Sequence, residues 1–360
     1  MDISRRTFLE NTTTFCLKTG LSVIFLSTTS AQTFATSPTA KEKKGGGVGL
    51  LFEPAYLKLH RTGELGERAE TLWAAMENCE LCPRSCGVNR LEGEEGFCHA
   101  PGTALIVSAF HPHFGEERPL VGDHGSGTVF LTHCNLRCVF CQNWEISHLG
   151  RGAEKSIDEL AAIMLKLQDA GCHNINIVTP THYSAHILKA VDRAAGAGLR
   201  LPIVYNTSGW ERQEILEALD GVVDIYLPDF KYWESDMSAQ YSSDAATYPE
   251  ITRQAILEMH RQVGVAKPAY NGYMQRGVMI RHLVMPNDIS GSEKIMEWIA
   301  DNLPKDTYIN IMAQYSPLFK AFEYPNLARR ITREEYVRVV EKARDLGLEN
   351  LDIQGYWWLR

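Results

Sequence analysis

The feature that most constrains the fold is a repeated alternation of strand and helix patterns after about residue 125. Short runs rich in β-branched and aromatic residues alternate with segments whose apolar residues recur at helical spacing. The predicted strands are Thr128–Thr132, Ile175–Thr179, Ile203–Tyr205, Val222–Leu227, Val278–Val284 and Tyr308–Met312. Strand–helix units in series form a parallel sheet with right-handed crossovers.

Six such units are two fewer than a closed eight-stranded barrel contains. The sequence therefore predicts an α/β fold, a partial (β/α)6 TIM-like barrel over residues 104–360. Capping boxes at Ser156…Glu159 and Thr332…Glu335 predict where two of the helices begin. Ligands bind at the carboxyl ends of the strands in sheets of this kind, so the residues just after each strand are the functional candidates.

Composition limits the range of functions. The 360 residues contain 36 Lys and Arg and 44 Asp and Glu, a formal net charge of −8, and this acidic balance disfavours a nucleic acid partner. A hydrophobic content of 44% is ordinary for a folded chain. The apolar run Leu21–Leu26 is far shorter than the roughly 20 residues that span a bilayer, so no membrane span is predicted.

Residues 1–40 are predicted to be a twin-arginine signal and linker. Arg5 and Arg6 precede the mildly apolar run, and small residues suited to cleavage follow it. The twin-arginine route carries folded, cofactor-loaded proteins to the periplasm. An inactive leader with a chance arginine pair, on a cytoplasmic protein, is the alternative.

Three cysteines directly follow the first predicted strand. Cys134, Cys138 and Cys141 have the spacing C-x3-C-x2-C, which places three thiolates on one loop at the functional end of the barrel. Thiolates suit zinc or iron–sulfur centres. Three ligands leave one metal position open, as in catalytic metal sites, so these residues predict a catalytic cluster.

The segment around these cysteines resembles a known family. It reads Gly125-Ser126-Gly127-Thr128-Val129-Phe130, then Cys134-Asn135-Leu136-Arg137-Cys138-Val139-Phe140-Cys141-Gln142-Asn143-Trp144. It resembles the radical S-adenosylmethionine (SAM) superfamily, in particular large relatives of pyruvate formate-lyase activating enzyme, over roughly residues 53–360. The resemblance implies that the three cysteines hold a 4Fe-4S cluster whose fourth iron chelates SAM. One electron then splits SAM, and the resulting 5′-deoxyadenosyl radical abstracts a hydrogen atom.

The resemblance also implies cofactor contacts at the next two strand ends. Many relatives have Gly-Gly-Glu where this chain has Thr179-Pro180-Thr181-His182, so Thr181 and the local carbonyls are expected to take over the contact with methionine. Asn206-Thr207-Ser208-Gly209 resembles the Asp-Thr-Asn-Gly of the activating enzymes, which implies that Asn206 and Thr207 contact SAM.

Asp229 and Lys231 match an Asp-x-Lys of the activating enzymes that contacts the methionine part of SAM. The two residues lie two apart and point the same way in an extended chain, and their opposite charges suit a zwitterion. A structural ion pair at the barrel rim is the alternative. Arg281 either contacts a carboxylate or forms an outward-facing salt bridge, and the segment around Glu116 either faces the substrate or is a solvated loop.

A second cysteine set lies ahead of the barrel, in residues 50–100, as a small N-terminal appendage. It consists of Cys79, Cys82, Cys86 and Cys98, with prolines and glycines that turn the chain tightly. Four thiolates can hold zinc or an auxiliary iron–sulfur cluster. Reduced structural thiols or disulfides are the alternatives, and the spacing does not choose the metal.

These features predict a radical SAM enzyme. Activation of a glycyl radical protein is its first candidate function, with a small molecule or a peptide as the alternative substrate. The electron donor would be a protein such as flavodoxin or ferredoxin. A catalytically inactive, exported metal-binding protein is the alternative outside catalysis.

Overall fold

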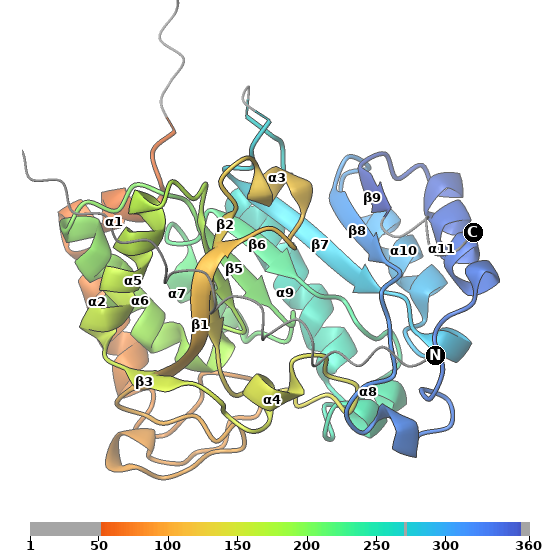
Figure 1. Ribbon diagram of the computed structural model, residues 1–360, viewed down its shortest axis with the longest axis horizontal. Coiled ribbons are helices and arrows are strands. Elements are labelled where there is room, and N and C mark those ends of the chain that lie inside the picture. Colours follow the sequence, from red (N-terminus) through yellow and green to blue (C-terminus); the bar gives the residue numbers. More distant parts are fainter. Residues whose placement is uncertain (1–51, 270–271, 354–360) are drawn as a thin grey trace, which may run out of the picture. The chain divides into compact units, whose positions relative to one another are not determined.

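The computed structural model describes residues 52–269 and 272–353 (Figure 1). These residues belong to one compact unit, Leu51–Arg360, which is divided from Met1–Leu50. The predicted twin-arginine signal and linker therefore lie outside the described residues. Within the described ranges, no helix is both long and apolar enough to cross a membrane.

The centre of the fold is a nine-stranded sheet in the order β3-β1-β2-β4-β5-β6-β7-β8-β9. The strands are β1 (Leu105–His113), β2 (Ser126–Leu131), β3 (Ala153–Lys155), β4 (Ile175–Val178), β5 (Ile203–Thr207), β6 (Ile225–Pro228), β7 (Gly277–Leu283), β8 (Tyr308–Met312) and β9 (Leu351–Ile353). Strands β3 and β9 are the two ends of this order, so the sheet curls without closing (Figure 1).

The six predicted strands correspond to β2, β4, β5, β6, β7 and β8, and they are parallel neighbours in that order. Their side chains are almost entirely buried, as expected for a parallel sheet covered by helices. This confirms the partial barrel with six strand–helix units.

The sheet also contains three strands that the sequence patterns do not predict. Strand β9 extends the parallel set beyond β8, whereas β1 runs antiparallel between β2 and β3. Strands β3 and β9 have only three residues each, none of them buried, and β1 is partly exposed and ends in His-Pro-His. Short or half-exposed edge strands have weak hydrophobic patterns, which explains why they are missed.

The helices pack outside the sheet. They are α1 (Tyr56–Thr62), α2 (Glu64–Ala74), α3 (Arg118–Val121), α4 (Trp144–Ser147), α5 (Ile157–Asp169), α6 (Ser184–Gly196), α7 (Gln213–Leu219), α8 (Ser235–Tyr241), α9 (Tyr248–Val263), α10 (Ser292–Asn302) and α11 (Arg333–Asp345), with short 3-10 turns at Arg90–Glu92, Thr181–Tyr183, Pro286–Asp288 and Ala321–Glu323. Both predicted capping boxes are present, at the starts of α5 and α11.

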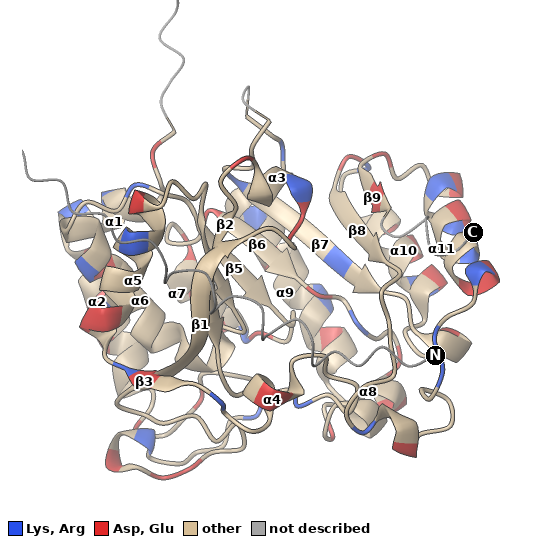
Figure 2. Cartoon of the chain, in the orientation of Figure 1, with Lys and Arg blue, Asp and Glu red and all other residues tan. Residues whose placement is uncertain are grey.

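The surface of these helices carries both signs of charge. Figure 2 shows acidic and basic residues side by side on α10 and α11. Lys342 pairs with Glu297 at 2.5 Å and Arg338 with Glu293 at 3.0 Å. Exposed pairs of this kind contribute little to stability, so the fold depends on the buried faces of the helices.

The segment from Cys79 to Cys98 packs against the barrel. Its buried Arg90 donates hydrogen bonds to the carbonyls of His182 and Pro101, each at 2.8 Å. A buried guanidinium needs such acceptors, because an unpaired charge is costly away from water. These bonds attach the cysteine segment to the turn that follows β4.

Candidate active site

A cavity of about 440 Å³ lies inside the barrel and is open to the loops that follow the strands. Its wall combines the loop after β2, the ends of β5 and β6, and the middle of β7. The predicted site residues in this wall are Cys134, Cys138, Cys141, Asn206, Thr207, Asp229 and Lys231. Tertiary structure thus brings together residues that are almost 100 positions apart in the sequence.

The three cysteines of the loop after β2 lie around one end of the cavity. Each sulfur has a neighbouring donor: the Leu136 N–H lies 3.3 Å from Cys134 Sγ, the Ser242 hydroxyl 3.1 Å from Cys138 Sγ, and the Ser147 hydroxyl 3.1 Å from Cys141 Sγ. Arg137, between the first two cysteines, has a φ of 48°, which folds the loop tightly. The donors and the turn direct all three thiols to the same side of the loop.

Burial raises the pKa of the Cys138 thiol to about 12, and the nearby Lys231 ammonium only partly offsets this effect. The buried loop therefore favours thiolates only when a positive centre binds to them. Across the described ranges, no three His, Cys, Asp or Glu side chains surround the position of a single metal ion. A 4Fe-4S cluster takes each thiolate on a different iron atom, so its ligands need not meet at one point, and the thiol loop fits such a group.

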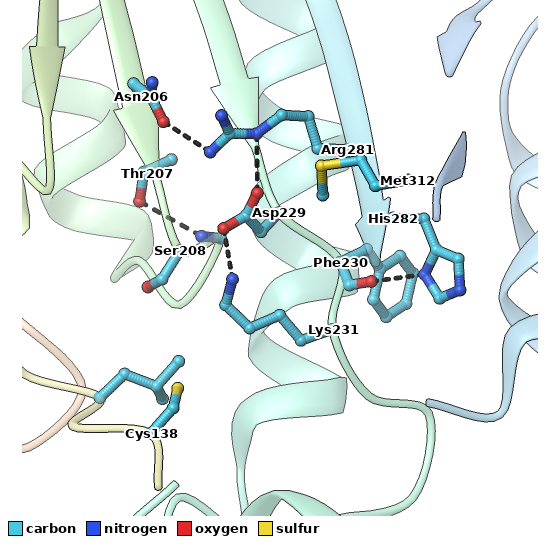
Figure 3. Close-up of polar contacts among 12 residues, drawn as sticks. Cys138, Asn206, Thr207, Ser208, Asp229, Phe230, Lys231, Arg281, His282 and Met312 are labelled. Carbon is cyan, nitrogen blue, oxygen red and sulfur yellow. Dashed lines mark hydrogen bonds and ion pairs between the residues drawn. The ribbon is translucent and has the colours of Figure 1, made fainter. Parts of the chain in front are cut away.

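A network of buried charges faces the cysteines across the cavity (Figure 3). Asp229 pairs with the Lys231 ammonium through one carboxylate oxygen and accepts a hydrogen bond of 2.8 Å from Arg281 Nε through the other. Arg281 also donates to Asn206 Oδ1 at 2.6 Å. In Figure 3, Lys231 and Ser208 lie on the side of Asp229 that faces Cys138. The network thus places an ammonium toward the thiol loop.

The charges in this network hold one another in the ionised form. Burial alone would raise the pKa of Asp229, but Arg281 and Lys231 outweigh it and hold that pKa below its usual range. Burial lowers the pKa of Lys231, but Asp229 outweighs it, so the net shift is upward. Both side chains are therefore charged at neutral pH and suit the carboxylate and amino groups of an amino acid.

Two further polar side chains belong to the cavity wall. The buried Ser208 hydroxyl has no hydrogen-bond partner within the described residues. Glu116, in the segment after β1, lies 3.7 Å from Arg281, and burial raises its pKa to about 7. The segment after β1 therefore faces the cavity at Glu116, and Arg281 points inward. The sequence alone leaves open whether Arg281 faces outward and whether the segment around Glu116 is a solvated loop.

Thr181 and Thr207 differ from the other predicted contacts. Thr181 is absent from the cavity wall, where Val178 and Thr179 represent its segment, and its hydroxyl donates to Glu211 at 2.6 Å. Thr207 lines the cavity, but its hydroxyl also bonds to Glu211. Thr181 therefore supports the wall from behind through its bond to Glu211.

Glu211 is a buried residue that the sequence patterns do not single out. It accepts hydrogen bonds from Thr181, which follows β4, and from Thr207, the last residue of β5, and burial raises its pKa to about 7. The turn before it requires Gly209, whose φ is +82° and where a Cβ would lie 2.3 Å from the Asp229 carbonyl oxygen. Glu211 and Gly209 thus join the ends of β4, β5 and β6 behind the cavity.

Three further residues near the ends of strands differ in their environments. His182 is buried but does not line the cavity, and its Nε2 lies 2.9 Å from the Thr132 carbonyl oxygen. Cys172, in the turn between α5 and β4, is a buried free thiol. Gln314, after β8, lines the cavity.

Comparison with known proteins identifies the family. The family model described as "Radical SAM superfamily" matches residues 128–264, a span that holds the three cysteines, Asn206, Asp229 and Lys231. An uncharacterized protein of Methanocaldococcus jannaschii, MJ0674, is 35% identical over 285 residues, which is 76% of this chain and 76% of that protein. The chain belongs to the radical SAM superfamily. This family implies a 4Fe-4S cluster and SAM as cofactors.

Two solved structures resemble parts of this chain. A domain of pyruvate-formate lyase-activating enzyme from Bacteroides vulgatus has 14% identity and a TM-score of 0.32, and the match covers 48% of this chain and 92% of that one. A radical SAM methyltransferase from Sphaerobacter thermophilus has 16% identity and a TM-score of 0.41, covering 63% of this chain and 66% of that one.

Proposed function

We propose that this radical SAM enzyme uses Cys134, Cys138 and Cys141 to hold a 4Fe-4S cluster and abstracts a hydrogen atom from a glycyl radical protein. The observation that carries the proposal is that the three thiols and the network of Asp229, Lys231 and Arg281 line one cavity. When bound, the cluster and SAM supply a 5′-deoxyadenosyl radical that abstracts the hydrogen atom.

The side chains of this cavity have distinct roles in the proposal. Lys231 neutralises the carboxylate of SAM, and Asp229 accepts a hydrogen bond from its amino group. Arg281 fixes the position of Asp229 through the bond at 2.8 Å. The buried wall excludes water, which strengthens each of these interactions and protects a reactive intermediate.

The first test is cleavage of SAM. The full chain is isolated and reconstituted without oxygen, reduced with dithionite and mixed with SAM, and 5′-deoxyadenosine is quantified. We expect product from the unmodified chain and from Cys172→Ala, which removes a buried thiol away from the cavity, and none from Cys138→Ala. Equal product from Cys138→Ala would refute the cluster assignment. Failure of the unmodified chain to bind SAM in calorimetry would favour the non-catalytic alternative.

The substrate needs a separate test, because members of one fold act on many substrates. Pyruvate formate-lyase is the probe for glycyl radical activation, with the radical detected by electron paramagnetic resonance (EPR). A glycyl signal that grows with 5′-deoxyadenosine supports activation. Formation of 5′-deoxyadenosine without any signal for this probe supports the small-molecule or peptide alternative.

We further propose that residues 1–40 direct export by the twin-arginine route after the cofactors are loaded. Cell fractionation followed by N-terminal sequencing tests this. A periplasmic protein that begins near Gln32 or Thr36 supports export. An intact chain confined to the cytoplasm, where flavodoxin or ferredoxin supplies electrons, refutes it.

A further inference from the structure

The four cysteines ahead of the barrel form a second built thiol site. Cys79, Cys82 and Cys98 are buried and Cys86 is half-buried, and all four are free thiols. Backbone hydrogen bonds join the first part of the set to the third, from the Gly87 N–H to the Cys79 carbonyl at 3.2 Å and from the Cys79 N–H to the Val88 carbonyl at 2.9 Å. The thiols of Cys79, Cys86 and Cys98 also lie near enough to interact electrostatically with that of Cys82.

Every sulfur of this set has an N–H donor from the same segment. The pairs are Arg90 Nη1 with Cys79 Sγ at 3.9 Å, the backbone N–H of Arg84 with Cys82, the backbone N–H of Phe97 with Cys86 Sγ at 3.4 Å, and the backbone N–H of Ala100 with Cys98. N–H donors to sulfur stabilise the excess negative charge of metal-bound thiolates. A donor at each of the four sulfurs therefore favours metal-bound thiolates over uncharged thiols.

Arg84 joins this set to the loop of Cys134, Cys138 and Cys141. Its Nε donates to the Asn135 carbonyl at 2.9 Å, and its Nη2 donates to the Ser242 carbonyl at 3.2 Å. The Ser242 hydroxyl in turn donates to Cys138 Sγ at 3.1 Å.

The Arg84 side chain is also held in place by two aromatic rings. Its guanidinium lies 3.8 Å from the centre of the Phe97 ring and 4.8 Å from that of Trp210. It interacts electrostatically with Cys82 and Cys86 of one set and with Cys134 of the other. One fixed guanidinium therefore interacts electrostatically with thiols of both sets.

The second set reaches the protein surface at Cys86. Ser85 and Gly87 are exposed on either side of the half-buried Cys86, whereas Cys82 is buried and interacts with Arg84. A centre with one edge near solvent and the other near a second thiol loop suits the passage of electrons, and a purely structural zinc site needs neither arrangement.

We propose that Cys79, Cys82, Cys86 and Cys98 hold an iron–sulfur cluster that passes single electrons to the cluster held by Cys134, Cys138 and Cys141. An external one-electron donor protein loses one electron to the second cluster, which then loses it to the first, so no proton or bond is exchanged. The existence of the second cluster is independent of the function proposed above, whereas its role as a relay rests on that function.

Metal content tests the second cluster without any use of SAM. The full chain is isolated without oxygen, and iron, sulfide and zinc are measured together with Mössbauer and EPR spectra. The triple variant Cys134→Ala/Cys138→Ala/Cys141→Ala should keep about four irons per chain, the content of one 4Fe-4S cluster. Cys82→Ala should lose the corresponding signal and keep the other cluster, and Cys172→Ala should lose neither.

Two results would overturn the proposal. One is zinc in the triple variant, and the other is a triple variant that binds no metal although its circular dichroism and melting match those of the unmodified chain. Because these assays contain no SAM, they separate failure of this proposal from failure of the proposed function.

Reduction kinetics test the relay. Photoreduced flavodoxin is the donor protein, and dithionite, which is small enough to enter the cavity, is the comparison. In the unmodified chain, flavodoxin should reduce the cluster held by Cys134, Cys138 and Cys141 in a fast phase. Cys82→Ala should lose this fast phase, whereas dithionite should reduce the same cluster at an unchanged rate. An unchanged fast phase in a variant shown to lack the second cluster would refute the relay.

Discussion

Asp229 lies at the centre of the buried charge network, so Asp229→Asn is the most informative single change. The substitution keeps the size of the side chain and removes its negative charge. Lys231 and Arg281 then lose their shared counterion, and one of the two must face an amide NH2 group in place of an oxygen. Glu116 is the remaining acid beside Arg281, at 3.7 Å.

The contacts of Asp229 set the size of the effect. Removing one partner from a buried ion pair costs about 3–5 kcal/mol, because the other charge stays buried without compensation. For domains of 150–250 residues each kcal/mol is about 2–4 °C in melting temperature, so a loss of about 6 °C or more is expected. A lost charge-assisted hydrogen bond to the amino group of SAM, about 1.5–3 kcal/mol, corresponds to affinity weaker by about 10- to 150-fold.

Two measurements check this prediction. Melting of the anaerobic protein is followed by circular dichroism, and SAM affinity by calorimetry on the reconstituted chain. Asp301→Asn is the matched control, because Asp301 is exposed near the end of α10, and it should change neither quantity. A variant of Asp229 that melts and binds SAM like the control would refute both the buried ion pair and the proposed role of Asp229.

Three further changes test the wall behind the cavity. Burial raises the pKa of Glu211 from 4.5 to about 7, so its contribution to stability is present below pH 4.5 and is lost as the pH rises through 7, a loss of about 3 kcal/mol. Glu211→Gln should flatten this part of the pH dependence in urea titrations, and an unchanged slope would contradict the assignment. Gly209→Ala should destabilise the fold more than Gly198→Ala, because both residues have positive φ but only Gly209 would clash, at 2.3 Å; equal losses on urea unfolding would contradict the clash. Thr181→Val should cost about 1–3 kcal/mol and leave SAM affinity unchanged, because its hydroxyl bonds to Glu211. Weaker SAM binding without loss of stability would place Thr181 at the cofactor instead.

The parallel core was predictable because its signals are local. Buried parallel strands such as β4 and β5 are continuous apolar runs, and the capping boxes of α5 and α11 lie within four residues each. The hydrophobic pattern does not predict strands that are only partly buried. Strand β1 alternates irregularly, so only its pairing with β2 and β3 reveals it.

Some residues of the candidate site are likewise predictable from the sequence, and others are not. Cys134, Cys138 and Cys141 are close in sequence and carry their chemistry in their spacing, and the resemblance located Asp229 and Lys231. The direction of a side chain depends on the sheet that carries it, and a sequence does not reveal that direction when both faces of a strand are buried. The sequence therefore does not decide the direction of Arg281 and does not single out Glu211.

The sequence by itself determined the family, the thiol triplet, the second cysteine set and the six parallel strands, because each is written in a few neighbouring residues or in a short period. Only the tertiary structure decided which of these features meet. Arg281 reaches Asp229 and Asn206 across 52 and 75 positions, and Arg84 reaches Asn135 across 51. Such contacts arise from the curvature of the sheet and from the need of each buried charge for a partner, and both are properties of the packed chain.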